Sequence, residues 1–390
     1  MAKKLKVALI RNAKDYDFGG AERFPVFLGE ILQDNGFCPV VITRHSRLLT
    51  FAASRSIKTI KSWWWSTQDW SGPKALLFPV YLIWQFILFF WYIQLFIKIK
   101  ADIIHIQSKD DFIAATWAGA ILGKKVIWTD HADLKHIWKN NSVWYKNPVG
   151  KLVRWSARFA NTITVVSNSE LVLISESLKK NDQIFKKIRI IHNGVADVSV
   201  EYSTKSDKSF KYCVVSRLVT DKGIGEAIKA FNNLTSKYPN DQLFIVGDGP
   251  DTKKFNNLAR NNPNIRLLGY QKDPLLYMAT CDIFVHPAYH EGFGISIIEA
   301  SMIGKPIIAT AVGGIVEIIT NNKTGLLVKE KSVSELQNAM ELLRNNKTLR
   351  NNLAKNARTQ YLNKFQFNQI VKDHFIPVYK GEPNENSHRD

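Results

Sequence analysis

Short β-branched runs alternate with longer segments of helical pattern along most of the 390 residues. Parallel strands need a crossover between them, so this alternation predicts β-α-β units, mainly parallel sheets, and ligand binding at the carboxyl ends of the strands. It occurs in two series, which predicts two α/β domains. The expected strands are 6–10, 40–43, 102–106, 126–129, 162–166 and 188–191 in the first series, and 212–215, 243–246, 265–268, 283–286, 306–309 and 325–328 in the second.

A polar stretch interrupts the alternation between the two series. Residues 196–210 are rich in serine, aspartate and lysine and contain no apolar run. Exposed polar linkers of this kind separate domains, so we place the boundary there. The chain is then two Rossmann-like halves, residues 1–200 and 208–365. A helix over 366–380 and a frayed tail over 381–390 follow them.

Basic residues outnumber acidic ones by 53 to 34, a formal net charge of +19. Such a charge favours an anionic partner: nucleic acid, an acidic membrane or a phosphorylated substrate. No nucleic-acid-binding module is recognisable, so we expect no nucleic acid partner. Cys38, Cys213 and Cys281 are scattered singly, which indicates neither a disulfide framework nor a zinc site. The chain starts directly with a strand and not with the apolar core of a secretory signal, so we expect a cytoplasmic protein.

The segment 286–304 carries the most informative pattern. The strand 283–286 and a glycine-containing loop lead into a helix that should start near Gly294. Backbone N–H groups at a helix start bind phosphate oxygens, and the carboxylates of Glu291 and Glu299 can accept hydrogen bonds from sugar hydroxyls. A nucleotide sugar offers both features. The alternative is a Glu291 stabilised by the helix dipole and a solvated Glu299, but the apolar neighbours of Glu299 favour a polar ligand.

A second cluster follows the first strand of the second series. Arg217 and Lys222 stand after the strand 212–215 and before a helix that Gly223 opens. A diphosphate bound at the carboxyl edge of the sheet needs cations at this place. The alternative is a pair of surface cations in a chain that has 53 lysines and arginines.

These motifs, in this order, resemble the donor-binding domain of the retaining nucleotide-sugar glycosyltransferases of family 4. The matching segments are 216–218 with 222–223, 246–249, the Glu-x7-Glu stretch 291–299, 304–310, 313–314 and 324–328. In the first half, residues 19–23 resemble the family's glycine turn and 191–195 the segment that closes its first domain. The resemblance implies the GT-B arrangement: two Rossmann-like domains whose parallel sheets face each other across a cleft, with C-terminal helices that return toward the N-terminal domain.

The resemblance also implies roles for individual positions. Arg217 and Lys222 would bind the donor diphosphate, Glu299 the ribose hydroxyls and Glu291 the transferred sugar. His131, at the end of a strand, aligns with a histidine that the family places near the reacting sugar, although a lone histidine is more often structural. The remaining donor-binding positions are Gly20 of the first domain and the backbone N–H groups of Phe293, Gly294 and Ile295.

The family's activity is the transfer of a sugar from a nucleotide donor, most often a UDP-sugar, with retention of configuration. In that mechanism the leaving phosphate is thought to take the acceptor's proton, which agrees with the absence of an obvious base in the sequence. We expect neither a metal nor a cofactor. Two alternatives remain: a GT-B nucleotide-sugar epimerase, which would need a carboxylate base near the sugar ring, and a basic nucleic-acid-binding protein.

The segment Ala75–Ile97 contains 23 residues without a charge, between Lys74 and Lys98. It is long enough to span a bilayer. The strand 102–106 follows almost at once and should join the same sheet as the strand 6–10, which argues against a crossing. We therefore predict a monotopic helix that lies in the membrane interface. The alternative is a buried crossover helix under the sheet.

Tryptophans and cations surround this segment in the sequence. Four tryptophans lie within residues 61–70, and Trp138, Trp144 and Trp155 are mixed with lysines and arginines. Tryptophan prefers the headgroup region, and cations attract anionic lipid. We expect the protein at the inner face of the cell membrane, in contact with an anionic surface. Its acceptor would then be a lipid-linked or membrane-proximal glycan of the cell envelope.

Overall fold

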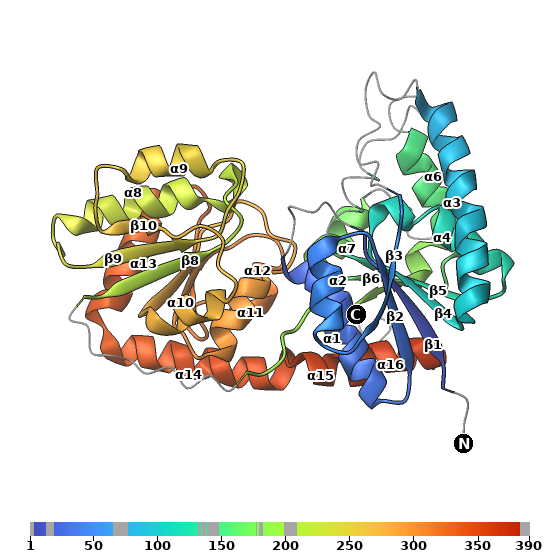
Figure 1. The fold of residues 1–390 in the computed structure, drawn as a ribbon. Helices are drawn as coiled ribbons and strands as arrows, with labels where there is room; N and C mark the ends of the chain where they lie inside the picture. The colour runs from blue at the N-terminus through green and yellow to red at the C-terminus, as the bar shows by residue number, and fades with distance from the viewer. Residues whose placement is uncertain are drawn as a thin grey trace. The chain divides into compact units, whose positions relative to one another are not determined.

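The computed structural model describes residues 4–12, 19–64, 77–131, 134, 138, 148–176, 178, 182–198 and 209–382. The chain forms two compact units (Figure 1). The N-terminal unit comprises residues 1–192 and 368–390, and the C-terminal unit comprises residues 193–367. The C-terminal segment of the chain therefore belongs to the N-terminal unit.

The N-terminal unit is built on a seven-stranded sheet in the order β3-β2-β1-β4-β5-β6-β7. Its neighbouring strands are all parallel, with Val7 opposite Ile103 where β1 meets β4. The expected pairing of the strand after the apolar segment with the first strand is therefore confirmed. The strands are β1 Lys6–Ile10, β2 Cys38–Thr43, β3 Lys58–Lys61, β4 Ile103–Ile106, β5 Lys125–Asp130, β6 Thr162–Val165 and β7 Ile188–Ile190.

Strand β3 is the one strand of this sheet that the sequence pattern did not predict. It is only four residues long, carries a lysine at each end and is not fully buried anywhere. It pairs with β2 alone, at the edge of the sheet. Edge strands are often short and charged, because such residues discourage pairing with a further strand. A pattern search based on apolar runs passes over them.

The helices of the N-terminal unit connect and cover these strands. They are α1 Gly20–Asp34, α2 Ser46–Ala53, α3 Phe78–Ile99, α4 Ala114–Ile121, α6 Pro148–Ser156, α7 Asn168–Ser175 and α16 Ile376–Lys380. Short 3₁₀ turns lie at Lys109–Asp111, Ala157–Phe159 and Phe185–Lys187, and a π-helical turn over Val371–Phe375 precedes α16. Helix α3 occupies most of the apolar segment predicted over 75–97; residues 75 and 76 lie outside the described residues.

Polar contacts join α16 to the sheet of the N-terminal unit. The hydroxyl of Tyr379 lies 2.6 Å from Nδ1 of His105, whose Nε2 lies 2.6 Å from Oγ1 of Thr129. Nζ of Lys125 donates to the carbonyl of Tyr379 at 2.8 Å. Burial lowers the pKa of His105 to about 3, so its ring is neutral and can bond a hydroxyl on each side. These contacts hold the end of the chain against β4 and β5.

The C-terminal unit is built on a six-stranded parallel sheet in the order β10-β9-β8-β11-β12-β13. The strands are β8 Lys211–Val215, β9 Gln242–Val246, β10 Ile265–Leu267, β11 Ile283–His286, β12 Ile307–Thr310 and β13 Leu326–Val328. The helices are α8 Ile224–Thr235, α9 Thr252–Ala259, α10 Pro274–Thr280, α11 Ile295–Met302, α12 Ile315–Ile318, α13 Val333–Asn345 and α14 Lys347–Lys364. The short helix α15 Phe367–Ile370 begins at the last residue of this unit and continues into the N-terminal unit. Each expected strand of this half is present.

Candidate active site

The loops that follow β8 and β11 meet at the carboxyl edge of the C-terminal sheet. Strand β8 lies between β9 and β11, so the chain leaves β8 to one side and later returns to its other side. Such a reversal leaves a crevice outside the strand ends, where ligands of open α/β sheets bind. Lys222, in the 3₁₀ turn Thr220–Lys222, comes from the first loop and Glu291 from the second. The fold thus brings together two predicted site residues that are 69 positions apart.

Glu291 is the centre of a small polar cluster. Its Oε2 accepts a hydrogen bond from Nζ of Lys222 at 2.8 Å and lies 3.1 Å from Nε2 of His286. The other ring nitrogen of His286 lies 3.3 Å from Oγ of Ser296. Burial alone raises the pKa of Glu291, but the hydrogen bond from His286 and the charge of Lys222 outweigh it and hold the pKa well below its usual range. Glu291 is therefore a carboxylate at neutral pH.

Two glycines allow the loops around Glu291 to pack backbone against backbone. Gly223 has φ +67°, and a Cβ there would lie 1.8 Å from the carbonyl oxygen of Pro287. Gly313 has φ +51°, and a Cβ there would lie 1.9 Å from the carbonyl oxygen of Glu291. No side chain fits at either position, because the contact is with main-chain atoms. These contacts fix the loop of Lys222 and the loop after β12 against the loop of Glu291.

Helix α11 starts beside this cluster. Gly294 precedes it with φ +111°, and the side chain of Phe293 is buried. The first N–H groups of a helix have no partner within the helix and bear partial positive charge, so this helix start is suited to an anion. Glu299 lies in the middle of α11 and is partly exposed. Arg217 lies on the same loop as Lys222 with an exposed side chain, outside the Glu291 cluster.

The predicted site residues of the N-terminal unit lie at the carboxyl edge of its own sheet. Gly20 is the first residue of α1, and the N–H of Gly19 before it donates to Oε2 of Glu22 at 2.8 Å. Oε1 of Glu22 pairs with Nη2 of Arg11 at 2.6 Å. Burial opposes the charge of Glu22, but Arg11 outweighs burial and lowers the pKa of this carboxyl. A carboxylate thus already occupies the start of α1.

His131 follows β5 in the N-terminal unit. Its ring meets the edge of Phe24 with 5.1 Å between ring centroids, and both of its ring nitrogens are buried. Burial, and then the charge of Arg11, lower its pKa well below the usual value, so the imidazole is neutral. Sequence reasoning missed four residues of the two sites: His286, Ser296, Arg11 and Glu22. A signal was available for His286 and Arg11, because each is a polar residue at the carboxyl end of a buried strand.

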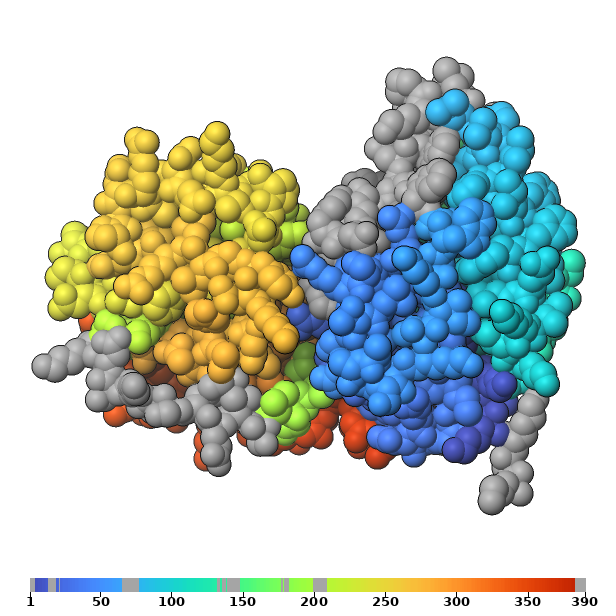
Figure 2. Space-filling view, viewed as in Figure 1, coloured from blue at the N-terminus to red at the C-terminus, as the bar shows by residue number. Residues whose placement is uncertain are grey.

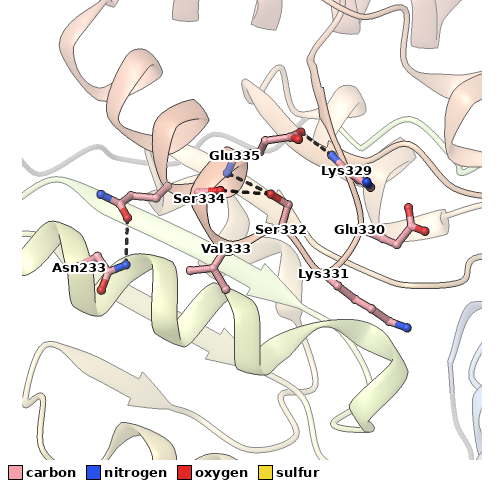
Figure 3. A pocket seen from close by; sticks show the side chains of 9 residues that line it. Asn233, Lys329, Glu330, Lys331, Ser332, Val333, Ser334 and Glu335 are labelled. Atoms are coloured by element: carbon pink, nitrogen blue, oxygen red, sulfur yellow. Dashed lines mark hydrogen bonds between the residues drawn. The ribbon is translucent and has the colours of Figure 1, made fainter.

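A hollow of about 630 Å³ lies in the C-terminal unit between α8 and the loop that joins β13 to α13 (Figure 3). Polar side chains line it, among them Asn233, Glu330 and Lys331. The ammonium group of Lys331 lies 5.0 Å from the centre of the Tyr289 ring, two residues before Glu291. None of the predicted donor-binding residues lines this hollow. Within the described ranges, no group of three or more histidine, cysteine or acidic side chains is placed to hold a metal ion.

Family models match the two halves of the chain. The model described as Glycosyltransferase Family 4 matches residues 18–197, and the model described as Glycosyl transferases group 1 matches residues 198–360. The two matches adjoin and leave out only the ends of the chain. The chain belongs to the family 4 glycosyltransferases. The resemblance in the sequence is thereby confirmed, and the fold is the α/β fold of the GT-B enzymes.

Curated relatives of the chain include glycosyltransferases that are named for capsular polysaccharide biosynthesis and for transfer to a sugar on diphosphoundecaprenol. The chain is 28% identical over 242 residues to the capsular polysaccharide biosynthesis glycosyltransferase CapM of Staphylococcus aureus, covering 56% of this chain and 63% of CapM. It is 28% identical over 310 residues to the UDP-Gal:alpha-D-GlcNAc-diphosphoundecaprenol alpha-1,3-galactosyltransferase of Escherichia coli, covering 72% of this chain and 76% of that protein. The match to an N-acetylgalactosaminyltransferase of Campylobacter jejuni covers 63% of that relative, so the chain spans less than two thirds of CapM and of this enzyme.

Solved structures share the fold over nearly the whole chain. The Anabaena protein HepE in complex with UDP-glucose has a TM-score of 0.76 at 18% identity. The likeness covers 96% of this chain and 100% of HepE. A glycosyltransferase from Rickettsia africae has a TM-score of 0.72 at 21% identity, with 98% of this chain and 100% of that protein covered. At these identities the likeness shows the fold alone.

Proposed function

We propose that this family 4 protein transfers a sugar from a nucleoside diphosphate sugar to a lipid-linked or membrane-proximal glycan, with retention of configuration. The observation that carries the proposal is the Glu291 cluster, a carboxylate held between Lys222 and His286 at the switch point of the C-terminal sheet. The E. coli relative is named for transfer from UDP-galactose to a sugar on diphosphoundecaprenol, and HepE was crystallised with UDP-glucose. Both names support a UDP-sugar donor here.

The charges of the cluster suit the two demands of this reaction. The departing nucleoside diphosphate gains negative charge, which Arg217, Lys222 and the start of α11 can stabilise. Glu291 accepts hydrogen bonds from hydroxyls of the transferred sugar, and Glu299 accepts them from the ribose. The leaving phosphate takes the acceptor's proton, so this mechanism needs neither a separate base nor a metal. Gly20 and His131 are the further site residues that the family resemblance implies in the N-terminal unit.

The ion pair also indicates how the donor enters. Lys222 and Glu291 neutralise each other while no donor is bound. A diphosphate offers Lys222 a second anionic partner, while Glu291 stays hydrogen-bonded to His286. The site is therefore charged and pre-formed before the donor arrives. Preorganised charges of this kind do not have to be assembled during the reaction.

Radiolabelled sugar transfer from a panel of UDP-sugars to extracted membrane lipids tests the proposal. We expect Lys222→Ala and Glu299→Gln to lower the transfer rate by about 100-fold, the usual effect of removing one preorganised electrostatic contact. Lys229→Ala, an exposed lysine on α8, is the matched control and should keep the wild-type rate. Wild-type rates in both site variants would overturn the assignment. Conversion of the UDP-sugar to its epimer without net release of free UDP would indicate the epimerase instead. Inversion at the anomeric carbon, measured by NMR, would refute retention.

The exposed face of α3 supports the membrane part of the proposal. Among the described residues, α3 is the one helix long and apolar enough to cross a membrane by length and composition. One side of it, with Tyr81, Gln85, Leu88 and Tyr92, is buried in the unit. The other side is apolar and exposed, with six side chains between 46% and 63% accessible: Val80, Ile83, Phe86, Ile87, Phe90 and Ile97. The helix is thus buried on one side only, and its exposed apolar side is available to lipid.

Aromatic side chains extend this surface beyond α3. Phe86 contacts Trp117 of α4 with 6.4 Å between ring centroids, Trp117 contacts Trp155 at 5.4 Å, and Trp155 contacts Phe159 at 5.0 Å. Figure 2 shows α3, in cyan, on the outside of its unit. The apolar surface therefore continues from α3 across α4 to α6 and the turn behind it. We call this surface the α3 face.

Cations at the end of α3 favour an anionic bilayer as the occupant of the α3 face. Lys98 and Lys100 are exposed at the end of the helix, and the chain has a net charge of +19. Each cation near an anionic surface contributes about 1 kcal/mol to binding. A helix with an apolar face and flanking lysines lies in the interface plane. The inner leaflet, which presents anionic lipid and lipid-linked acceptors, is the membrane that we propose.

A further inference from the structure

The N-terminal sheet has its own switch point, and Gln107 stands at it. Strand β1 lies between β2 and β4, so the chain reverses there as it does at β8 in the other unit. Arg11 follows β1 directly and Gln107 follows β4 directly. The backbone of Gln107 is fixed on both sides, because its N–H donates to the carbonyl of Ile10 at 2.9 Å and its carbonyl accepts from Nη1 of Arg11.

The side chain of Gln107 has no hydrogen-bond partner in the part of the chain that the structure describes. It is only 1% exposed, yet neither its amide nitrogen nor its amide oxygen is bonded. Both ring nitrogens of His131, after the neighbouring strand β5, are likewise buried without a partner, and so is Nε of Arg11. Buried polar groups in folded proteins are nearly always paired, so several unpaired ones at the carboxyl edge of one sheet require an explanation.

The chemistry of these groups points to a neutral polar ligand. The amide of Gln107 offers donors and an acceptor, and a neutral imidazole offers one donor and one acceptor. The charge of Arg11 is already matched by Glu22 at 2.6 Å. The set therefore lacks the surplus of cations that a phosphate requires and has the mixed donors and acceptors that a hydroxyl group satisfies. A sugar presents several such hydroxyls in a fixed arrangement.

We propose that Gln107 binds a sugar hydroxyl in the reaction and helps to determine which sugar is used. The inference rests on the proposed glycosyl transfer and adds to it a specificity residue outside the Glu291 cluster. The hydroxyl belongs either to the transferred sugar or to the acceptor sugar, and the two sources have different kinetic signatures. If Gln107 only supports the fold, its replacement lowers the melting temperature and the activity together.

The test is the variant Gln107→Met, of similar size but without the amide, with Gln33→Met on the exposed side of α1 as control. Transfer and acceptor-free hydrolysis of UDP-glucose, UDP-galactose and UDP-N-acetylglucosamine are measured, together with UDP binding by calorimetry and the melting temperature. We expect kcat/KM for transfer to fall about tenfold, the value of one lost hydrogen bond. UDP affinity should stay at the wild-type value, because UDP has no transferred sugar.

The melting temperature separates recognition from structure. Removing an unpaired buried amide relieves its desolvation cost, so Gln107→Met should melt at the wild-type temperature or above it. If the transferred sugar is the ligand, hydrolysis falls together with transfer; if the acceptor is the ligand, only the acceptor's KM rises. Unchanged kcat/KM, or a loss of activity that follows a lower melting temperature, would overturn the inference. A wild-type protein that neither binds UDP nor uses any of these donors would instead refute the proposed function on which the inference depends.

Discussion

Two substitutions on the α3 face test whether it binds a membrane. Phe86 and Phe90 are 54% and 60% exposed. A phenylalanine side chain has about 200 Å² of surface, so Phe86→Ser with Phe90→Ser removes about 200 Å² of exposed apolar area. At about 25 cal/mol per Å² this area contributes about 5 kcal/mol if all of it enters lipid. Even if half enters, the vesicle partition coefficient should fall about 50-fold.

The assay is co-sedimentation with vesicles of phosphatidylglycerol and phosphatidylethanolamine. The control replaces Leu276 and Leu342, two leucines of the C-terminal unit that are 49% and 48% exposed, by serine. We expect the control to sediment like the wild type. The free energy of unfolding of the α3 variant should change by no more than about 0.5 kcal/mol, because exposed side chains contribute little to stability. Wild-type sedimentation of the α3 variant would refute the reasoning, and a large loss of stability would favour the buried crossover helix.

Three further predictions concern stability. Gly223→Ala should lower the free energy of unfolding by about 2 kcal/mol in urea titrations, because its Cβ would meet the carbonyl of Pro287. Gly225→Ala should not, because its Cβ would lie 3.9 Å from Cδ1 of Leu258, in ordinary van der Waals contact. The pKa of Glu291 is lowered from 4.5. The difference in the free energy of unfolding between wild type and Glu291→Gln should therefore be constant above about pH 5 and shrink as the pH falls below that value. A difference that does not depend on pH down to about pH 3 would contradict this. Burial raises the pKa of Asp111 from 3.8 to about 7. The contribution of Asp111 to the free energy of unfolding, relative to Asp111→Asn, should therefore be full below about pH 4 and lost as the pH rises through 7. A contribution that grows with rising pH would contradict this.

The strands were predictable because each is a short apolar run that the sheet buries. Leu9 and Phe284, for example, have no exposed surface. Strand β3 was not, since lysines occupy both of its ends and only an edge position makes such a strand possible. Pattern reasoning detects burial, and β3 is not buried. Helix α3 was predictable as an apolar helix, but its orientation was not. A segment that is apolar all round does not show which side of the helix packs against the protein.

The tryptophans show the same limit. We expected them at the headgroup region, yet Trp64 and Trp138 are only 1% and 2% exposed and belong to the core of the N-terminal unit. Trp63 and Trp155, at 53% and 45% exposed, do face outward. Residues 65, 70 and 144, the other tryptophans of that prediction, lie outside the described residues. A tryptophan's preference for an interface does not reveal whether the interface is a membrane or the protein's own core.

The positions of the candidate site could be found from motifs, whereas its contacts could not. The glycine loops and strand ends located Lys222 and Glu291 separately. Their ion pair, and the bond of Glu291 to His286, depend on how β8 and β11 lie side by side. The unpaired amide of Gln107 is visible only once its surroundings are known, because nothing in the sequence distinguishes it from any other glutamine after a strand.

Hydrogen–deuterium exchange with and without UDP tests the central claim most directly. If the Glu291 cluster and the start of α11 bind the donor diphosphate, UDP should slow exchange in peptides that cover residues 216–225 and 288–299. Lys222→Ala should remove that protection at the same UDP concentration, and Lys229→Ala should not. Protection by UDP confined to other parts of the chain, or unchanged by Lys222→Ala, would contradict the account.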